Sequence, residues 1–152
     1  MKPINLIDHP EGGRYQEVFR SNVSVSTSDA SARCALSHIY FSLNQDEKSC
    51  FHKVDSDEIW NLYQGIGLYL YLWDGTDSPP QRITISPEEN QFCYVVPSGV
   101  WQAAMPIEGK ILVGCSVAPG FEFSGFELLK SDSKKAELLL SIAPDLRNLV
   151  IT

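Results

Sequence analysis

The sequence predicts a mainly β protein, built as a sandwich or barrel and followed by a short helical segment. Three observations support this fold class. Between residues 14 and 128 the chain is a succession of short runs rich in Val, Ile, Phe, Tyr and Trp, separated by polar turns. Residues 67–73, GLYLYLW, alternate strictly between leucine and aromatic side chains, which is the two-residue period of a strand. Near the C-terminal end the apolar residues change to helical spacing.

The first strand candidates lie around residues 15–19 and at residues 33–43. In the first candidate, Tyr15, Glu17 and Phe19 share one face. The second, RCALSHIYFSL, divides into a face with Cys34, Leu36, His38 and Tyr40 and a face with Ala35, Ser37, Ile39, Phe41 and Leu43. The polar run NQDEKS then ends it. Next, SCFHKV and DEIWNLY flank a turn at residues 55–57, which predicts a hairpin.

The rest of the chain continues this pattern and then leaves it. The Asp-Gly and double proline of DGTDSPPQ predict a loop at residues 74–81. Short strands are then expected at RITI, FCYVV, VWQAA, KILVGCSV and FEFSGFEL. In residues 133–144 the spacing of Ala136, Leu139, Leu140 and Ala143 predicts a helix, with a second short turn beginning at Pro144.

Length and charge restrict the class of protein. The 152 residues suit one domain, and we expect residues 1–152 to form it. Twelve Lys and Arg against 19 Asp and Glu give a net charge of −7, which disfavours nucleic acid and anionic membrane surfaces as partners. The N-terminus does not resemble a secretory signal and no run is apolar enough to span a membrane, so a cytoplasmic location is expected.

The strongest candidate site lies in the run CFHKVDSDEIWNLYQG. Cys50 and His52 are two residues apart and share one face of a strand, and Glu58 opens the strand that returns. Such a hairpin can direct all three side chains toward one point. Farther along, the turn in PSGVWQ allows Gln102 to point into the same interior.

These two segments resemble the two motifs of the cupin superfamily. The first motif there has His-x-His, then a Glu, six residues and a Gly, and Glu58 and Gly65 match its last part. Four longer blocks resemble the Cupin_5 (DUF985) family: HPEGGRYQEVFRS at 9–21, FHKVDSDEIW at 51–60, VPSGVWQAA at 96–104 and LVGCSVAPGFEFSGFEL at 112–128. The resemblance implies an RmlC-like double-stranded β-helix, or jelly-roll barrel, with an open-ended internal pocket and usually a homodimeric assembly. It implies no settled activity.

The departures from the superfamily motif bear on metal binding. Cys50 stands where the motif has its first His, and Gln102 stands where the second motif has a His. His52 and Glu58 alone remain of a set that would ordinarily present three His and one Glu, and two ligands rarely hold a transition metal tightly. We therefore expect no metal and no cofactor. The alternative is a divalent metal such as zinc, held with the help of a Cys50 thiolate.

The remaining residues define the expected roles. Glu58 would pair with His52 and raise its pKa, which suits a general base or a polar ligand anchor. His52 and Glu58 are the candidate catalytic residues. The same two residues with Cys50, Gln102 and Trp60 are the candidate ligand-binding set, in which Trp60 supplies an apolar wall. His9 is interpreted as a structural residue in a turn.

These residues leave several functions open. The leading hypothesis is a protein that binds a small polar organic molecule, of sugar or nucleotide-sugar type, inside the barrel. The second hypothesis is a metal-independent epimerase or isomerase that uses His52 paired with Glu58. A divalent-metal cupin enzyme is the third hypothesis, and an inert scaffold is the fourth. Whether the protein is an enzyme therefore stays undecided from the sequence.

Overall fold

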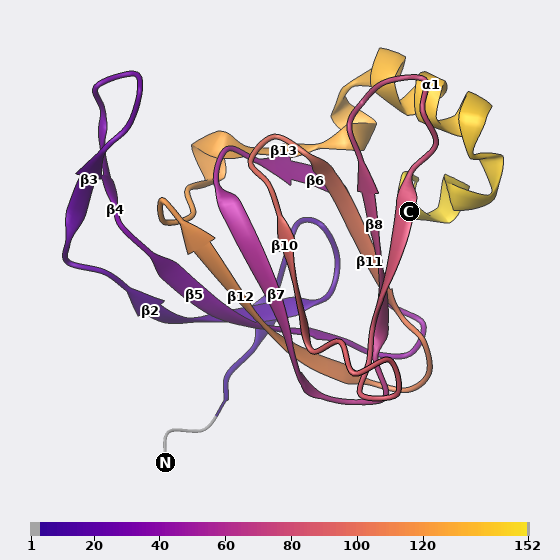
Figure 1. The fold of residues 1–152 in the computed structure, drawn as a ribbon, viewed down its shortest axis with the longest axis horizontal. Helices are drawn as coiled ribbons and strands as arrows, with labels where there is room; N and C mark the ends of the chain where they lie inside the picture. Colours follow the sequence, from indigo (N-terminus) through magenta and orange to yellow (C-terminus); the bar gives the residue numbers. More distant parts are fainter. Residues whose placement is uncertain (1–3, 152) are drawn as a thin grey trace.

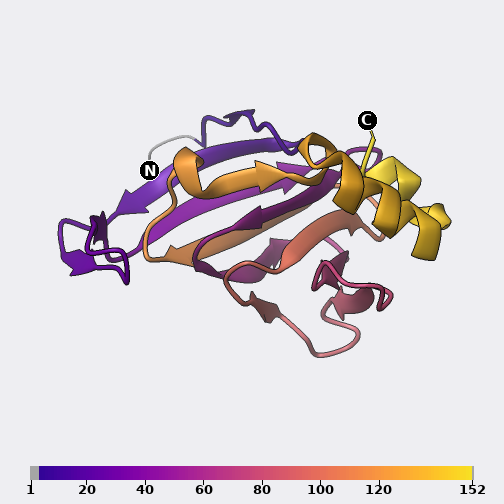
Figure 2. The same cartoon turned by 90° about the horizontal axis from the view of Figure 1, so that it is seen from above.

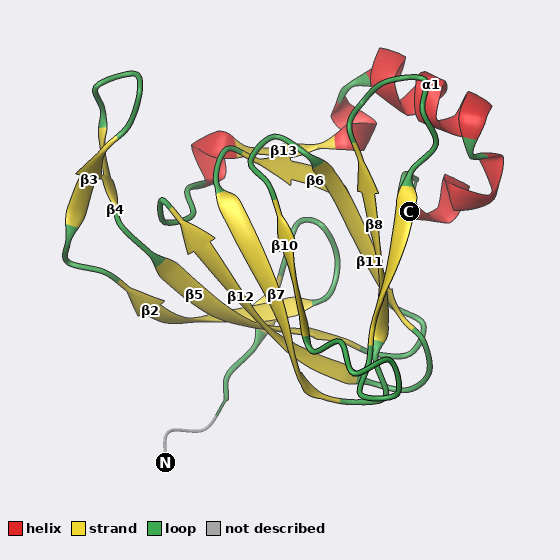
Figure 3. Cartoon of the chain, in the orientation of Figure 1, coloured by secondary structure: helices red, strands yellow, loops and turns green. Residues whose placement is uncertain are grey.

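Two antiparallel sheets face each other and enclose the core, as Figures 1 and 2 show. The computed structural model describes residues 4–151. Figure 3 shows that strands form the body of the molecule and that most of the helical residues lie near the C-terminal end. The predicted mainly β barrel with a helical C-terminal segment is confirmed.

The larger sheet has six strands in the order β1-β2-β5-β12-β7-β10. The bounds are β1 Ile7–Asp8, β2 Arg14–Arg20, β5 Ser37–Leu43, β12 Ile111–Ala118, β7 Asp57–Gln64 and β10 Cys93–Val96. From β5 onward, neighbours in this order are not consecutive in the sequence, and the chain crosses repeatedly between the sheets, as a jelly roll requires.

The smaller sheet has five strands in the order β13-β6-β11-β8-β9. The bounds are β13 Phe126–Leu128, β6 Ser49–Val54, β11 Trp101–Pro106, β8 Leu68–Trp73 and β9 Gln81–Ile85. A separate two-stranded ribbon, β3 Ser24–Ser26 with β4 Ala32–Cys34, projects from one side of the barrel (Figure 1).

The expected hairpin around residues 55–57 is wrong in its pairing. β6 and β7 do follow each other, but β6 joins the five-stranded sheet and β7 joins the six-stranded sheet. The turn therefore carries the chain from one sheet to the other. As a result, His52 and Glu58 face each other across the interior instead of lying side by side.

Two other expected strands are shorter in the structure. Residues 33–43 are divided between β4, which pairs with β3 in the two-stranded ribbon, and β5, which pairs with β2 and β12 in the six-stranded sheet. The run at residues 121–128 is a strand only in β13; before it comes a short 3-10 helix, Phe123–Gly125. At Gly125 a side chain would collide with the carboxylate of Asp55, so this turn packs closely against the β6–β7 connection.

The C-terminal segment covers the outer face of the five-stranded sheet. It comprises α1 Ser133–Ile142 and a 3-10 helix Pro144–Leu149, as predicted, preceded by a 3-10 helix Leu129–Ser131 that was not predicted. Asp132 caps α1 by accepting a hydrogen bond from the amide of Lys135. Leu139 and Leu149 pack on Trp73 and Trp101, and all four are buried. Among the helices of residues 4–151, none has the length and apolarity needed to cross a membrane.

Candidate functional site

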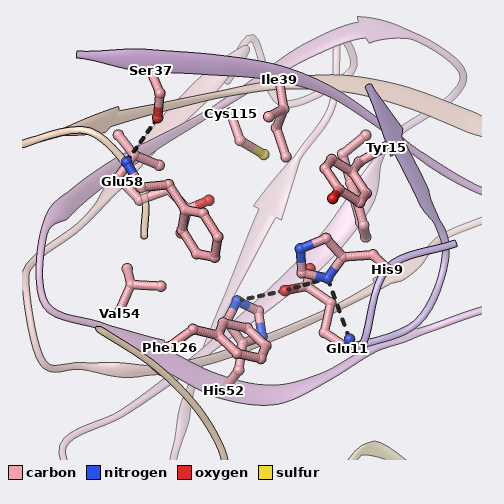
Figure 4. Close-up of a pocket in the computed structure, with 13 residues that line it drawn as sticks. His9, Glu11, Tyr15, Ser37, Ile39, His52, Val54, Glu58, Cys115 and Phe126 are labelled. Atoms are coloured by element: carbon pink, nitrogen blue, oxygen red, sulfur yellow. Dashed lines mark hydrogen bonds and ion pairs between the residues drawn. The ribbon is translucent and has the colours of Figure 1, made fainter. Parts of the chain in front are cut away.

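A cavity opens between the two sheets near the end of the barrel where β7 begins and β12 ends (Figure 4). The space that the centre of a water molecule can occupy is about 30 Å³, room for a very few waters. Its walls combine apolar and ionisable side chains: His9, Glu11, Tyr15, Ser37, Ile39, Phe41, His52, Val54, Glu58, Cys115, Val117, Phe121 and Phe126. Two of the five predicted site residues, His52 and Glu58, line it.

His52 is buried on β6 and uses both ring nitrogens. Nδ1 lies 2.8 Å from the carbonyl oxygen of Cys50, which can only accept, so Nδ1 carries a proton. Nε2 lies 3.1 Å from Oε2 of Glu11. The direct partner of His52 is therefore Glu11, and the expected pairing with Glu58 is wrong. Burial lowers the pKa of His52, more than the charge of Glu58 and the Cys50 carbonyl raise it, which also corrects the expected upward shift.

Glu11 comes from the turn that precedes β2. Gly12 has a φ of 112° and lies so close to the carbonyl of Lys48 that a side chain would collide with it. This tight turn presses Glu11 against β6, where its Oε1 accepts a hydrogen bond of 2.8 Å from the hydroxyl of Ser49. Burial raises the pKa of Glu11 to about 8, with the Ser49 hydrogen bond acting in the opposite direction.

Glu58 stands on the opposite sheet and faces neutral donors. Its Oε2 accepts a hydrogen bond of 2.6 Å from the amide nitrogen of Gln102, and the thiol of Cys115 also hydrogen-bonds to it. Burial raises the pKa of Glu58 to about 7, against the smaller lowering influence of His52. A carboxyl group with a pKa close to neutrality inside a cavity can act as a ligand anchor or as an acid-base group.

Gln102 and Trp60 lie outside the cavity and are linked to Glu58 by hydrogen bonds. Gln102 pairs with His52 in the sheet register and is fully buried. Its Oε1 accepts a hydrogen bond of 2.7 Å from the indole of Trp60. Trp60 is 1% exposed and packs on Phe41 in the apolar core, so neither side chain lines the cavity. Both residues were expected to contact a ligand. In the structure they form a hydrogen-bonded chain from Trp60 through Gln102 to Glu58, which orients the Glu58 carboxylate.

Cys50 is also outside the cavity lining, although its backbone carbonyl orients His52. The positions of Cys50 and Gln102 decide whether this cavity could hold the metal ion that the superfamily motif binds. Both polar atoms of the Gln102 amide are engaged within the protein, by Trp60 and Glu58. Within residues 4–151, no group of three or more His, Cys, Asp or Glu is arranged to hold a metal ion. The residues present thus do not fit the metal centre that the superfamily motif describes.

Sequence reasoning missed the contribution of the N-terminal block. His9, interpreted as a turn residue, lies against Tyr15 with ring centroids 4.8 Å apart and contacts four phenylalanines. Its Nδ1 accepts a hydrogen bond of 3.3 Å from the Glu11 amide, and burial, followed by the charge of His52, lowers its pKa to about 4. The hydroxyl of Tyr15 hydrogen-bonds to no residue within 4–151. The available signal was the HPEGG block itself, in which two glycines mark a turn that places polar residues next to a strand.

Phe121 separates the cavity from an outer groove. The groove has a volume of about 400 Å³ and shares Tyr15, Ser37, Ile39 and Phe121 with the cavity. The amide of Phe121 donates to the Ser37 hydroxyl at 2.8 Å, and its carbonyl accepts from the Arg20 guanidinium at 2.9 Å. Two hydrogen bonds therefore hold this residue over the cavity mouth.

Solved structures resemble the chain along most of its length. A hypothetical protein from Leishmania major is 27% identical with a TM-score of 0.78, covering 95% of this chain and 90% of the other. A protein from Shewanella oneidensis is 32% identical with a TM-score of 0.77, covering 95% and 88%. Oxalate decarboxylase of Bacillus subtilis is 14% identical with a TM-score of 0.60, covering 88% and 33%, so it shares the fold alone. No curated protein matches the chain.

The sequence profile of Cupin_5, described as Cupin superfamily (DUF985), matches residues 1–129. This range contains both sheets of the barrel and the residues that line the cavity. The chain therefore belongs to the Cupin_5 (DUF985) family of the cupin superfamily.

Proposed function

We propose that the protein binds a small polar organic molecule in the barrel cavity, where His52 and Glu58 determine its orientation. The observation that supports this most directly is the placement of these two groups on opposite walls of one cavity, with apolar side chains between them. Apolar walls with a few converging polar groups are the usual composition of a small-molecule site.

The dimensions of the cavity favour a ligand of few heavy atoms. With Phe121 in place, the free space of about 30 Å³ does not admit a sugar or a nucleotide sugar. A larger molecule would have to extend past Phe121 into the groove of about 400 Å³ outside it. The compound class suggested by the sequence thus requires movement at the mouth, whereas a smaller polar molecule does not.

Thermal-shift screening of a metabolite panel tests the binding proposal. A ligand of the cavity stabilises the wild type by mass action and loses this effect in His52→Ala. Glu137→Gln is the control, because Glu137 is exposed on α1, which covers the five-stranded sheet, and does not line the cavity. Equal stabilisation of the wild type and His52→Ala by every active compound would refute the assignment.

Metal-independent proton transfer is the second candidate function, favoured by the free hydroxyl of Tyr15 across the cavity. Glu58 is the better base, because Nε2 of His52 is engaged by Glu11. Ionised Glu58 would take a proton from a carbon next to a carbonyl, and Tyr15 would protonate the carbonyl oxygen as the enol forms. Return of the proton from Glu58 to carbon, while the enol hydroxyl gives its proton back to Tyr15, would complete an isomerisation and restore both residues.

Hydrogen exchange in D2O tests this second candidate. Wild-type protein should exchange the carbon-bound hydrogen of a small α-hydroxy carbonyl compound, as measured by loss of its proton NMR signal. Tyr15→Phe and Glu58→Gln should each slow the exchange by about 100-fold or more. Unchanged exchange in both variants would exclude this chemistry from the cavity.

We also propose that the outer face of the six-stranded sheet associates with a second copy of the chain. Two rows of residues cross this face without any Asp, Glu, Lys or Arg: Val95, Ile59, Ser116, His38 and Phe19, and Cys93, Asn61, Gly114, Tyr40 and Gln16. Depletion of charge is typical of interface centres, and it avoids repulsion between two chains of charge −7. Light scattering should give twice the monomer mass, and Ile59→Arg should return it to the monomer value.

A further inference from the structure

Among residues 4–151, the cavity has two acidic groups in its wall and no permanently charged base. Glu11 and Glu58 are each 7% exposed, and the described lining includes no Lys or Arg. A buried carboxylate requires a counter-charge or a proton, because leaving it charged and unpaired in a low-dielectric interior is too costly. The question is therefore what balances these two groups when they ionise.

The hydrogen bonds show that the lining residues supply at most one positive charge there. Nδ1 of His9 accepts from the Glu11 amide at 3.3 Å and lies 3.5 Å from Oε2 of Glu11, and burial lowers the pKa of His9 to about 4, so His9 carries no charge at neutral pH. Nδ1 of His52 is protonated, and one further proton is shared between its Nε2 and Glu11. When His52 takes this proton, it balances Glu11. Glu58 then has no second cation among the lining residues to balance it.

The elements packed around Glu58 also contribute no second positive charge that could balance it. β12 contributes the thiol of Cys115, β11 the amide of Gln102, β6 the imidazole of His52, and the N-terminal turn the carboxyl of Glu11. The contrast with the rest of the molecule is clear, because four carboxylates nearer the surface are paired with cations in Arg14–Glu47, Arg20–Glu17, Arg33–Asp55 and Lys53–Glu127.

The other walls suit a cation as well. Tyr15, Phe41, Phe121 and Phe126 line the cavity. The negative face of an aromatic ring attracts ammonium and guanidinium groups, and the attraction increases when the cation is removed from water. An anionic ligand would instead add a third acidic group to a cavity whose described walls hold no Lys or Arg.

We propose that the cavity selects a small organic cation, of the primary-ammonium or amidinium class, whose charge lies against Glu58 and the aromatic rings of Phe121 and Phe126. This inference rests on the proposed binding function and assigns its ligand class. The cation completes the charge balance that the cavity walls leave open. The free volume limits it to a few heavy atoms unless Phe121 moves.

Three molecules of nearly equal size but different charge test the inference: ethylammonium, ethanol and acetate. NMR titration of the 15N-labelled protein at neutral pH reports both affinity and location. A ligand of three heavy atoms has a Kd on the order of 1 mM at best. We expect ethylammonium to shift the signals of cavity residues, with a Kd at least about tenfold lower than that of ethanol. Acetate should produce no shift at the cavity.

Variants then assign the charge recognition to one residue. Glu58→Gln keeps the size of the side chain and removes the charge, so ethylammonium should bind about as weakly as ethanol. Glu137→Gln is the control, because Glu137 is exposed on α1 and its loss changes the net charge equally. If Glu58→Gln does not fold, Phe126→Leu tests the aromatic wall and should weaken ethylammonium binding more than ethanol binding.

The outcomes separate the ligand class from the site. If ethanol or acetate binds in the cavity as tightly as ethylammonium, the cation inference fails while the proposed binding function stands. If ethylammonium binds Glu58→Gln as well as it binds the wild type, its site is elsewhere on the acidic surface and the inference is overturned. If none of the three perturbs the cavity at concentrations far above 1 mM, the cation inference fails, and a silent metabolite panel would then also refute the binding function.

Discussion

The two ends of the barrel interior have opposite compositions. At the end where β8 and β12 begin, Leu43, Leu68, Leu70, Ile85 and Ile111 are fully buried and packed together. At the other end, the inward positions of β6 and β7 are His52 and Glu58, and a cavity remains between them. The alternation of the strands is the same at both ends. The difference shows that one end stabilises the fold, whereas the other keeps polar groups desolvated at a cost in stability.

The largest expected effect is at the packed end. Leu70→Ala should lower the free energy of unfolding by about 2–5 kcal/mol, because the sealed surroundings cannot collapse into the space left by the side chain. Urea denaturation measures the loss. Ligand binding by the folded variant should be unchanged. A loss below about 1 kcal/mol would contradict the assignment of stability to this end.

The desolvated carboxyl groups of the polar end should make the free energy of unfolding depend on pH. Burial raises the pKa of Glu58 to about 7 and of Glu11 to about 8, from 4.5 for an unfolded chain. Raised pKa values of acids mean that the folded state holds protons that the unfolded chain has released, so stability falls as pH rises from about 4.5 to about 8. His9, with a pKa lowered to about 4, adds stability only as pH rises toward 6.5, so it does not oppose the fall above pH 7.

Between pH 7 and pH 8 the folded state should release about one more proton than the unfolded chain, and the free energy of unfolding should fall by about 1 kcal/mol. Urea denaturation at the two pH values measures this change. Glu58→Gln should reduce the fall by about a quarter, because Glu11, with the higher pKa, contributes most of it, and Glu137→Gln should leave it unchanged. A stability that is constant or rises over this interval would show that the cavity carboxyls are not desolvated.

Two valines on β12 allow the packing at the two ends of the barrel to be compared with the same substitution. Val113 and Val117 both point inward from β12, but only Val117 lines the cavity. Val113→Ala should destabilise the protein by roughly 1 kcal/mol more than Val117→Ala, because Val117 already lacks neighbours on its cavity side. The difference in urea midpoints measures this. Equal losses would mean that the cavity end is as tightly packed as the opposite end.

The smallest expected effect is that of metal removal. Dialysis against EDTA should change the melting temperature by less than about 1 °C, because only a ligand bound to the folded state contributes to its stability. Plasma mass spectrometry on protein purified without a His tag, with His52→Ala as control, measures the metal content directly. Stoichiometric metal that disappears in His52→Ala would contradict the donor geometry described above.

Much of the fold follows from local pattern. The alternation in residues 57–63 places Glu58 and Trp60 on one face, and the structure agrees. The helical spacing after residue 132 corresponds to α1. The proximity of Gln102 to Glu58 also followed from the sequence, through the motifs that carry both residues. In the first two cases the relevant information lies within a few neighbouring residues, whereas the third case depends on the family resemblance of two separate motifs.

The partners of the site residues did not follow in this way. Glu11 reaches His52 because a turn near the N-terminus packs against β6, and no periodicity links the two segments. Cys50 has the same parity as His52 and yet does not line the cavity, in a strand whose register with β11 shifts beyond Gln102. Parity states which face a side chain takes, but not whether that face is open or filled.

The sequence by itself determined the mainly β class, the C-terminal helix, the family motifs and the inward direction of His52 and Glu58. The tertiary structure decided which sheet each strand joins, which carboxyl pairs with His52, and where the interior stays open. The physical reason is the range of the forces involved. Side-chain alternation is set by neighbouring residues, whereas burial, pairing and the resulting pKa shifts depend on segments that meet only when the barrel closes.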